Sequence, residues 1–305
     1  MQNFTKNLVQ STFQFGQEFL SGLKPKLAIF VIFLTSQICI AETKFADYKR
    51  IVSIGGSVTE IIFALEQQYR LVGRDSTSTY PAEVTDLPDV GYMRALSPEG
   101  VLSVGPELII AEAGSGPQET IDLLAQASIP FVTIPDTYSR AGIISKVIAV
   151  GHALGMQPEA ENLSIKLNED LKAAEDQANS INGARKKVLF ILSTTGGKIL
   201  TSGSNTAADG IIKMAGGINA ISEFDGYKPL SDEAVTLAAP DAILMMDRGG
   251  DHNTANDELF AIPAIATTPA AETQTIIRMN GLYLLGFGPR TASAIMELHN
   301  ALYAE

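Results

Sequence analysis

One tyrosine stands out as a side chain that could bind a metal. Tyr80 lies in the segment Asp75-Ser76-Thr77-Ser78-Thr79-Tyr80-Pro81, where small polar residues lead to a single aromatic ring. Pro81 restricts the backbone of Tyr80 to extended conformations, which would hold the ring in one direction. A tyrosine oxygen can ligate ferric iron, including haem iron, because the charge of the metal favours the phenolate over the phenol. A loop tyrosine that packs on Pro81 and donates a surface hydrogen bond is the alternative.

The elements around this loop predict an α/β fold. From Arg50 onward, short β-branched runs alternate with amphipathic stretches, which is typical of βα units around a mainly parallel sheet. The predicted strands are 51–54, 71–74, 108–111, 131–134, 188–192, 199–201, 242–246 and 275–279, and the predicted helices include 58–68, 118–127 and 291–303. A long helical region from about 140 to 180, broken near 151–158, separates the two sets of strands.

A repeated segment links the two sets of strands. SPEGVLSVGPELII at 97–110 matches SDEAVTLAAPDAIL at 231–244 in register, 134 residues later. Each copy is typical of a short helix, a turn containing a proline and an acidic residue, and a buried strand. The repeat predicts two similar lobes, whose ligand would gather beyond the carboxyl ends of the strands. The loops that this places around the ligand follow Arg74, Ala111, Leu192 and Met246.

The first 41 residues are predicted to be a secretory signal peptide. Three lysines precede the apolar stretch 27–40, which is shorter than a membrane-spanning helix, and Ala41 follows it. A retained N-terminal anchor is the alternative. Cys39 is the only cysteine, so the exported chain would contain no thiol. The rest of the chain divides into an N-terminal lobe (42–138), a helical linker (139–180) and a C-terminal lobe (181–305).

Charge and motifs exclude several classes of function. The 34 acidic and 22 basic residues give a net charge of -12 with no basic run, which argues against nucleic-acid binding. The sequence contains no G-x-S-x-G elbow, P-loop or H-E-x-x-H motif, and Gly55-Gly56 lacks the third glycine of a dinucleotide site. A bare divalent metal would need several His, Asp or Glu residues converging on the cleft. We therefore expect a binding protein and not an enzyme.

A resemblance to a known family sharpens this expectation. Periplasmic haem-binding proteins of bacterial ABC haem importers are similar to this chain over about residues 48–303, in DSTSTYPAEVTDLPDVGYMRALSPEGVLSVGPELIIAE, TAADGIIKMAGG, GYKPLSDEAV and GFGPRT. The resemblance implies the class III periplasmic binding protein fold, with two Rossmann-like lobes of mainly parallel sheets joined by a long helix. It also implies a monomer that captures haem in the periplasm, outside the membrane, and delivers it to an ABC permease dimer with its ATPase. A same-fold binding protein for cobalamin or a ferric siderophore is the alternative.

The resemblance assigns haem contacts to particular residues. Tyr80 occupies the axial-ligand position in the S-x-Y-P loop, and Arg248 matches an arginine of the opposite lobe that hydrogen-bonds the phenolate. Met93 would lie against the porphyrin face, and Arg94 would meet a propionate. A solvated Arg248 paired with a neighbouring aspartate, and a Met93 that only fills the core, are the alternatives.

Histidine is the other obvious iron ligand. Some members of the family use a second-lobe histidine as sixth ligand, but none follows Leu192 at the expected place, which suggests a five-coordinate site. His252 follows Arg248 by four residues and is the candidate sixth ligand. His152 and His299 lie in predicted helices, where a structural role is expected.

A pair of carboxylates is a candidate for docking to the permease. Glu60 and Asp209 lie near the start of the first helix of each lobe, where the related binding proteins carry acidic residues that meet arginines of the permease. Mirrored carboxylates would suit a two-fold transporter. Alternatively, Glu60 closes a capping box with Ser57 at its own helix start.

Overall fold

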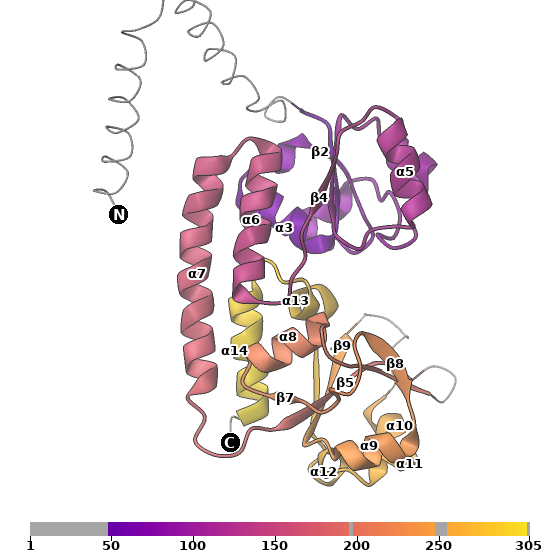
Figure 1. Ribbon diagram of the computed structural model, residues 1–305, viewed down its shortest axis with the longest axis vertical. Helices are drawn as coiled ribbons and strands as arrows, with labels where there is room; N and C mark the ends of the chain where they lie inside the picture. Colours follow the sequence, from indigo (N-terminus) through magenta and orange to yellow (C-terminus); the bar gives the residue numbers. More distant parts are fainter. Residues whose placement is uncertain (1–47, 195–197, 248–254, 304–305) are drawn as a thin grey trace, which may run out of the picture. The chain divides into compact units, whose positions relative to one another are not determined.

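The computed structural model describes residues 48–194, 198–247 and 255–303. These residues form two α/β lobes, which we call the first lobe (48–138) and the second lobe (187–303). The helices α6 (Arg140–Leu154) and α7 (Gln157–Asn179) connect the lobes (Figure 1). The predicted signal peptide lies outside the described residues.

The first lobe is built on a parallel sheet with helices on both faces. The strands β1 (Ile51–Ile54), β2 (Leu71–Arg74), β3 (Leu108–Glu112) and β4 (Phe131–Ile134) lie in the order β2-β1-β3-β4. Ile51 and Ile110 pack with α6 and with α3 (Gly56–Ala64). Val52 and Ile109 point to the other face, toward α4 (Pro98–Leu102) and α5 (Gln118–Gln126). Burial on both faces explains why the central strands β1 and β3 are nearly uninterrupted apolar runs.

The second lobe contains a mixed sheet in the order β10-β9-β5-β6-β8. Strands β5 (Lys187–Ser193), β9 (Ala242–Asp247) and β10 (Ile276–Asn280) are parallel. Strand β6 (Ile199–Ser202) runs antiparallel to both of its neighbours, β5 and β8 (Tyr227–Leu230), and β7 (Ile218–Asn219) pairs with the start of β5. One face is covered by α8 (Ala207–Met214), α13 (Gly281–Leu285) and α14 (Thr291–Tyr303). The other is covered by α9 (Asp232–Ala238), α10 (Asn256–Phe260), α11 (Pro263–Ala266) and α12 (Pro269–Glu272).

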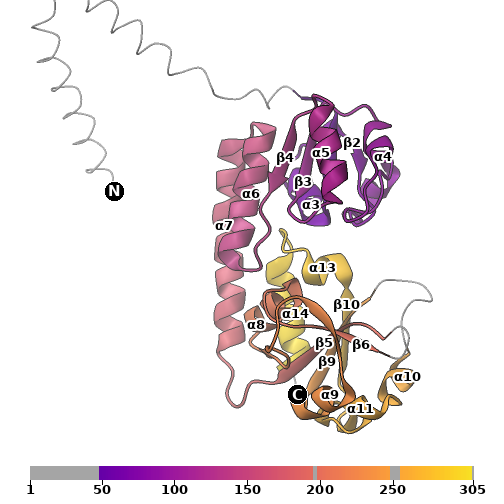
Figure 2. The ribbon, with the colours of Figure 1, turned by 45° about the vertical axis from the view of Figure 1, so that its right-hand side comes forward.

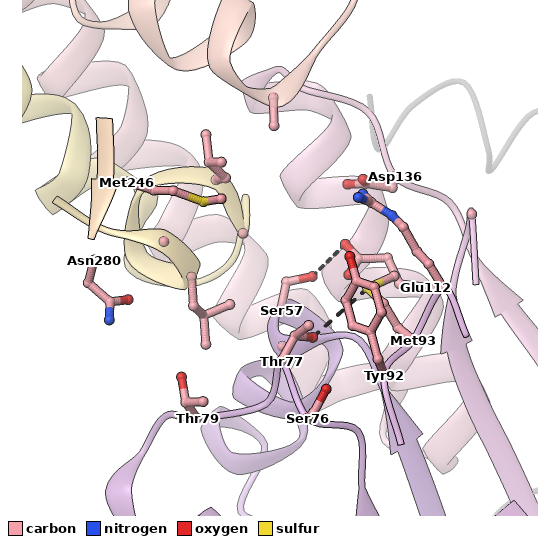
Figure 3. Close-up of a pocket in the computed structure, with 18 of the residues that line it drawn as sticks. Ser57, Ser76, Thr77, Thr79, Tyr92, Met93, Glu112, Asp136, Met246 and Asn280 are labelled. Atoms are coloured by element: carbon pink, nitrogen blue, oxygen red, sulfur yellow. Dashed lines mark hydrogen bonds between the residues drawn. The ribbon is translucent and has the colours of Figure 1, made fainter. Parts of the chain in front are cut away.

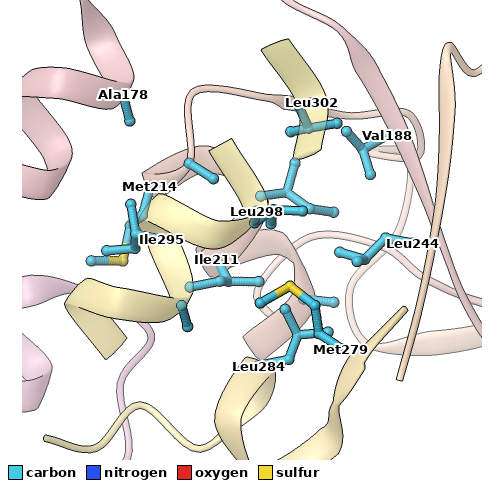
Figure 4. Packing of buried hydrophobic residues seen from close by; sticks show 14 of the residues in the cluster. Ala178, Val188, Ile211, Met214, Leu244, Met279, Leu284, Ile295, Leu298 and Leu302 are labelled. Carbon is cyan, nitrogen blue, oxygen red and sulfur yellow. The ribbon is translucent and has the colours of Figure 1, made fainter. Parts of the chain in front are cut away.

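Apolar packing holds the first of these faces together. Ile211 of α8, Leu284 of α13 and Leu298 of α14 belong to one buried cluster with Val188 and Leu244 of the sheet (Figure 4). The same cluster includes Leu171, Ala174 and Ala178 from α7. The long helix is therefore part of the core of the second lobe.

The predicted repeat has the same local structure in both lobes. Ser97 and Ser231 are the N-caps of α4 and α9, and each hydroxyl accepts a hydrogen bond from the backbone amide three residues later. Glu107 and Asp241 each accept a hydrogen bond from the backbone at the entrance to the lobe's central strand, from Lys49 at 2.8 Å and Lys187 at 2.7 Å. The neighbours β1-β3-β4 and β5-β9-β10 also have the same order and direction. These matches support a duplicated design.

The strand predictions agree with the structure to within about one residue at each end. Those at 71–74 and 131–134 match β2 and β4, and the break in the helical region lies between α6 and α7. The predicted helix 58–68 is shorter, because α3 ends at Ala64 and a 3-10 turn follows at Gln68–Arg70. Strand β8 and helix α13 were not predicted; Tyr227–Leu230 is largely exposed and contains a proline, so it lacks a core-facing pattern.

The helix α7 packs against both lobes. Its neighbours are α6, whose apolar residues line the core of the first lobe, and α14 of the second lobe (Figure 2). The helices α6 and α7 approach closely at Gly151, where an added Cβ would lie 2.2 Å from the Cβ of Ala160. Among the described helices, none combines the length and apolar character that a bilayer crossing requires.

We expect Gly151→Val to lower the free energy of unfolding by about 1–3 kcal/mol, because the larger side chain overpacks the contact between α6 and α7. Valine is a better helix former than glycine, so helix propensity alone predicts a small gain. The measurement is urea-induced unfolding followed by circular dichroism. Ser145→Val, at an exposed position of α6, is the control. Equal stability of the two variants would contradict the expected overpacking.

Candidate ligand-binding cleft

A cavity of about 890 Å³ is lined by residues of both lobes. Its walls are the loops at the carboxyl ends of the strands, as the repeat predicted (Figure 3). The first lobe contributes Thr77, Thr79, Met93, Arg94, Glu112, Gly114, Asp136 and Tyr138. The second lobe contributes Leu192, Tyr227, Met246, Asp247, Asn280, Leu282 and Leu285. The mixture of apolar, aromatic and a few charged side chains suits a partly apolar ligand at the upper end of the usual size range.

The loop after β2 is organised by one buried aspartate. The Asp75 carboxylate accepts hydrogen bonds from the Gly55 amide (2.9 Å), the Ser78 hydroxyl (2.7 Å) and the amide and hydroxyl of Thr77 (2.9 and 2.6 Å). A further hydrogen bond joins Ser78 to Thr59 of α3 at 2.7 Å. The small polar residues that precede Tyr80 thus fasten the loop to the first lobe, and only the tip of the loop projects.

Tyr80 lies beside the cavity and is 45% exposed. It is not one of the residues that form the wall, although its neighbour Thr79 is. Its ring contacts the guanidinium of Arg290, with 3.6 Å between the Cζ atom and the ring centroid. This contact brings a cation of the second lobe to the predicted iron ligand.

Met93 and Arg94 both line the cavity, and their predicted haem contacts stay predictions. Met93 is 9% exposed and its sulfur accepts a long hydrogen bond from the Thr77 hydroxyl at 3.9 Å, so it serves the core and the wall at once. Arg94 is exposed, and the preceding Tyr92 is 44% exposed. Across the cleft, Tyr227 of β8 lines the cavity from the second lobe, as Tyr92 does from the first lobe.

A buried ion cluster forms the inner end of the cavity. The Lys146 ammonium is fully buried and lies 2.6 Å from Glu112 Oε1 and 2.8 Å from Asp136 Oδ1. It also lies within hydrogen-bond distance of Ser57 Oγ (2.9 Å) and of the Gly286 carbonyl of the second lobe (3.2 Å). Ser57 in turn donates to Glu112 at 2.8 Å (Figure 3). Burial raises the pKa of Glu112 even though the Lys146 charge opposes the shift.

Two tyrosines of the cavity are poor candidates for a phenolate. Burial and the nearby Asp136 carboxylate raise the pKa of Tyr138 to about 12. Burial also raises the pKa of Tyr227. Both side chains therefore favour the neutral phenol and can act as hydrogen-bond donors at neutral pH.

The carboxylates predicted to dock the permease are not free on the surface. Glu60 is 6% exposed and forms a bidentate ion pair with Arg290, at 2.9 and 2.6 Å. Asp209 is 5% exposed and pairs with Lys213 at 2.7 Å and with Asn219 at 3.1 Å. A partner arginine would have to displace these internal partners. The docking role of Glu60 and Asp209 stays a prediction. The alternative of a capping box at Glu60 is wrong, because Gly55 is the N-cap of α3, no side chain caps this helix, and Glu60 binds Arg290.

Arg248 and His252 lie outside the described residues, so their predicted roles stay predictions. The other two histidines lie in helices, as expected. His152 is on the exposed side of α6, and the His299 ring in α14 is within hydrogen-bond distance of the Ala215 carbonyl at 3.1 Å. Within the part of the chain that the structure describes, His, Cys, Asp and Glu residues do not cluster into a metal site.

A family model decides the class of this protein. The model described as "periplasmic binding protein" matches residues 51–281. The chain belongs to this family. Periplasmic binding proteins bind and carry ligands and are not enzymes, and the two-lobed fold predicted from the sequence is the fold of this family.

Solved relatives of this periplasmic binding protein share its fold over most of the chain. The haem-binding protein RhuT from Roseiflexus sp. RS-1, in apo form, is 40% identical with a TM-score of 0.80, covering 84% of this chain and 98% of RhuT. BhuT, in complex with two haems, is 38% identical with a TM-score of 0.79, covering 83% and 97%. By sequence alone, the chain also matches a vitamin B12-binding protein of Pectobacterium atrosepticum, at 24% identity over 90% of this chain and 95% of that protein.

Several residues of the site were missed in the sequence. Arg290 belongs to the GFGPRT segment, but no role was attached to it. Lys146 is a charged residue within the apolar face formed by Ile143, Val147 and Val150, and that mismatch was the available signal. The partners of both cations come from distant segments, so spacing along the chain could not identify them.

We expect Lys146→Met to lower the free energy of unfolding by about 3–5 kcal/mol at pH 7, because it leaves Glu112 and Asp136 buried without a cation. Burial raises the pKa of Glu112 and the Lys146 charge lowers it, so the pKa of Glu112 should be higher still in the variant than in the wild type. The deficit should therefore shrink as the pH falls through the pKa of Glu112 in the variant, because protonation removes the unpaired charge.

Denaturant unfolding at several pH values measures this effect. Lys172→Met is the matched control, because Lys172 forms an exposed pair with Asp176 one turn away on α7. Such pairs contribute only a few tenths of a kcal/mol, about 0.3–0.5. A Lys146→Met deficit no larger than that of the control would show that the cluster is not an energetic centre.

Proposed function

We propose that this protein captures haem in the periplasm and delivers it to an ABC import permease. The observation that carries the proposal is Tyr80, presented by a tightly hydrogen-bonded loop at the edge of a two-lobed cavity. Relatives at 38–40% identity are haem-binding proteins, and this similarity supports haem over the more distant vitamin B12. The volume of about 890 Å³ is in keeping with a ligand of this size or larger.

Iron ligation through Tyr80 is the central step of the proposed capture. Tyr80 is partly exposed and lies against a cation, whereas burial favours the neutral form of Tyr138 and Tyr227. Ferric iron binds the phenolate, so the side chain that can carry negative charge is the better ligand. Met93 and Leu282 would cover the ring of the porphyrin, and Arg94 would meet a propionate. Arg248 is retained in the proposal as the partner of the phenolate, and His252 as the candidate sixth ligand.

Replacing Tyr80 by Ala should weaken haemin binding by more than about 100-fold, because even the loss of an outer partner of a metal ligand costs about 10- to 100-fold. Titration of the apoprotein with haemin, followed by visible absorption, measures the affinity and the tyrosinate-to-iron charge-transfer band. Tyr138→Phe should keep the band, since Tyr138 is expected to remain a phenol. Tyr69→Phe, at a position 75% exposed, is the control.

The same titration separates haem from its alternative. A wild-type protein that binds cobalamin or a ferric siderophore but shows no spectral change with haemin would reject the proposal. Haemin binding that survives in Tyr80→Ala with an unchanged band would reject the ligand assignment while leaving haem as cargo.

We also infer that docking uses the exposed acidic pair of the repeat. Glu99 at the start of α4 and Glu233 at the start of α9 hold equivalent positions in the two copies, and both side chains are exposed. Hydrogen bonds from its own amide and from Ser231 lower the pKa of Glu233, so it is charged at neutral pH. Symmetric docking was expected of Glu60 and Asp209, but their carboxylates are bound to partners inside the protein. Glu99 and Glu233 offer the same symmetry on the surface.

Charge reversal at both positions, Glu99→Arg with Glu233→Arg, should reduce stimulation of the permease ATPase by roughly 10-fold at low salt, because like charges slow the encounter. Haemin affinity should not change, since neither residue lines the cavity. Glu161→Arg with Glu169→Arg, on the exposed face of α7, is the control with the same change in net charge. Full stimulation by the Glu99 and Glu233 double variant would reject this docking surface.

The family of this protein is periplasmic. We propose in addition that the segment 1–41 directs its export. N-terminal sequencing of the protein recovered from periplasm would show the processed end. Retention in the membrane fraction would favour the uncleaved anchor.

A further inference from the structure

An arginine of the second lobe is held by a carboxylate of the first. Arg290 directly precedes α14, and its Nε and Nη2 groups donate to Glu60 Oε2 and Oε1 at 2.9 and 2.6 Å. Glu60 lies on α3 and is 6% exposed, so this bidentate pair is largely removed from water. The two residues are 230 positions apart in the chain. The pair therefore joins the lobes at a defined point.

The face of the same guanidinium carries the Tyr80 ring. Its Cζ atom lies 3.6 Å from the centroid of Tyr80 and 5.1 Å from that of Tyr283. Both distances are within the range of a cation–π interaction. Arginine can make both contacts at once, because the edge of its planar group binds a carboxylate while its face stacks on an aromatic ring. Glu60 thus fixes the plane against which Tyr80 lies.

This arrangement affects Tyr80 in two ways. Asp75 anchors the loop within the first lobe as far as Ser78, two residues before Tyr80. Stacking on a fixed plane limits the rotation of the Tyr80 side chain. In addition, a positive charge over the ring attracts the negative charge that the phenolate carries when it binds iron. Glu60 balances the charge of Arg290, which is half-buried beside the Tyr80 ring.

We propose that Arg290, clamped by Glu60, is a positioning residue for Tyr80 that makes iron ligation depend on contact between the lobes. The proposal rests on the proposed haem ligation by Tyr80. When the lobes are in contact, the ring is oriented and its negative charge is stabilised. When the second lobe moves away, Arg290 leaves with it and Tyr80 binds iron less tightly. Opening of the lobes then weakens the iron bond as well as exposing the ligand.

The test removes the charges of the clamp while keeping a neutral hydrogen-bonded pair. In Glu60→Gln with Arg290→Gln, haemin affinity should fall by roughly 2- to 30-fold, the range expected for one lost cation–π contact. The haemin dissociation rate, measured by transfer to a haem acceptor in excess, should rise by a similar factor. The resonance Raman bands of the iron-bound tyrosinate should shift or broaden, which a role in stability alone would not produce.

A second ion pair provides the matched control. Arg140 donates to Glu175 at 2.9 Å between α6 and α7, and neither residue lines the cavity. Arg140→Gln with Glu175→Gln should leave affinity, dissociation rate and Raman bands at wild-type values. Thermal unfolding of each variant reports whether it is folded.

Arg290→Lys covers the case in which the double variant does not fold. Lysine keeps the charge opposite Glu60 but lacks the planar face and the bidentate contact, so the Raman bands should change while the protein stays folded. Wild-type values for a folded Glu60 and Arg290 double variant, or for Arg290→Lys, would overturn the proposal. If wild-type protein shows no tyrosinate bands with haemin, that result rejects iron ligation by Tyr80. It does so independently of any result on Arg290 and Glu60.

Discussion

The burial of a single ammonium group constrains the centre of this protein. Lys146 has no contact with water and needs several partners, because an unpaired buried charge is very costly. Its partners come from α3, from the ends of β3 and β4 and from the second-lobe carbonyl of Gly286. These contacts fix the carboxyl ends of two strands relative to α6 and to the opposite lobe. The loops of the cavity are built on that fixed base.

The cluster also divides the cavity chemically. Its inner end carries Glu112 and Asp136 with a shared cation, whereas Arg94 is the exposed basic residue among the described lining residues. Glu112 and Asp136 repel the carboxylates of a ligand, and the exposed Arg94 attracts them. A flat ligand with an apolar body and an acidic edge is therefore best placed with that edge away from Lys146. The polar groups favour one orientation of the ligand, while the apolar wall is tolerant of either face.

Periodicity and turn residues predicted most of the fold, and the repeat predicted where the cavity would be. Strands such as 51–54 and 108–111 are recognisable because a strand buried on both faces is apolar along most of its length. The loop containing Tyr80 was found because its composition changes abruptly from apolar to small and polar. The cross-lobe contacts could not be found in this way. Glu60 was interpreted as a cap or a docking residue, since its helix suggests both, and only the folded chain brings Arg290 to it. Strand β8 was missed because an exposed edge strand lacks an apolar pattern.

The mirrored helix starts at Ser97 and Ser231 have a consequence for assembly. Each lobe presents a helix start with a serine N-cap and an exposed acidic residue, so the two ends are nearly equivalent. Against a partner with a true two-fold axis, the protein could seat in either of two settings related by a half-turn. Both settings would be productive, so the encounter rate would gain a statistical factor of about two. The ligand does not have this symmetry, so the two settings would present opposite sides of it to the permease. The translocation pathway of the permease would have to accept both orientations.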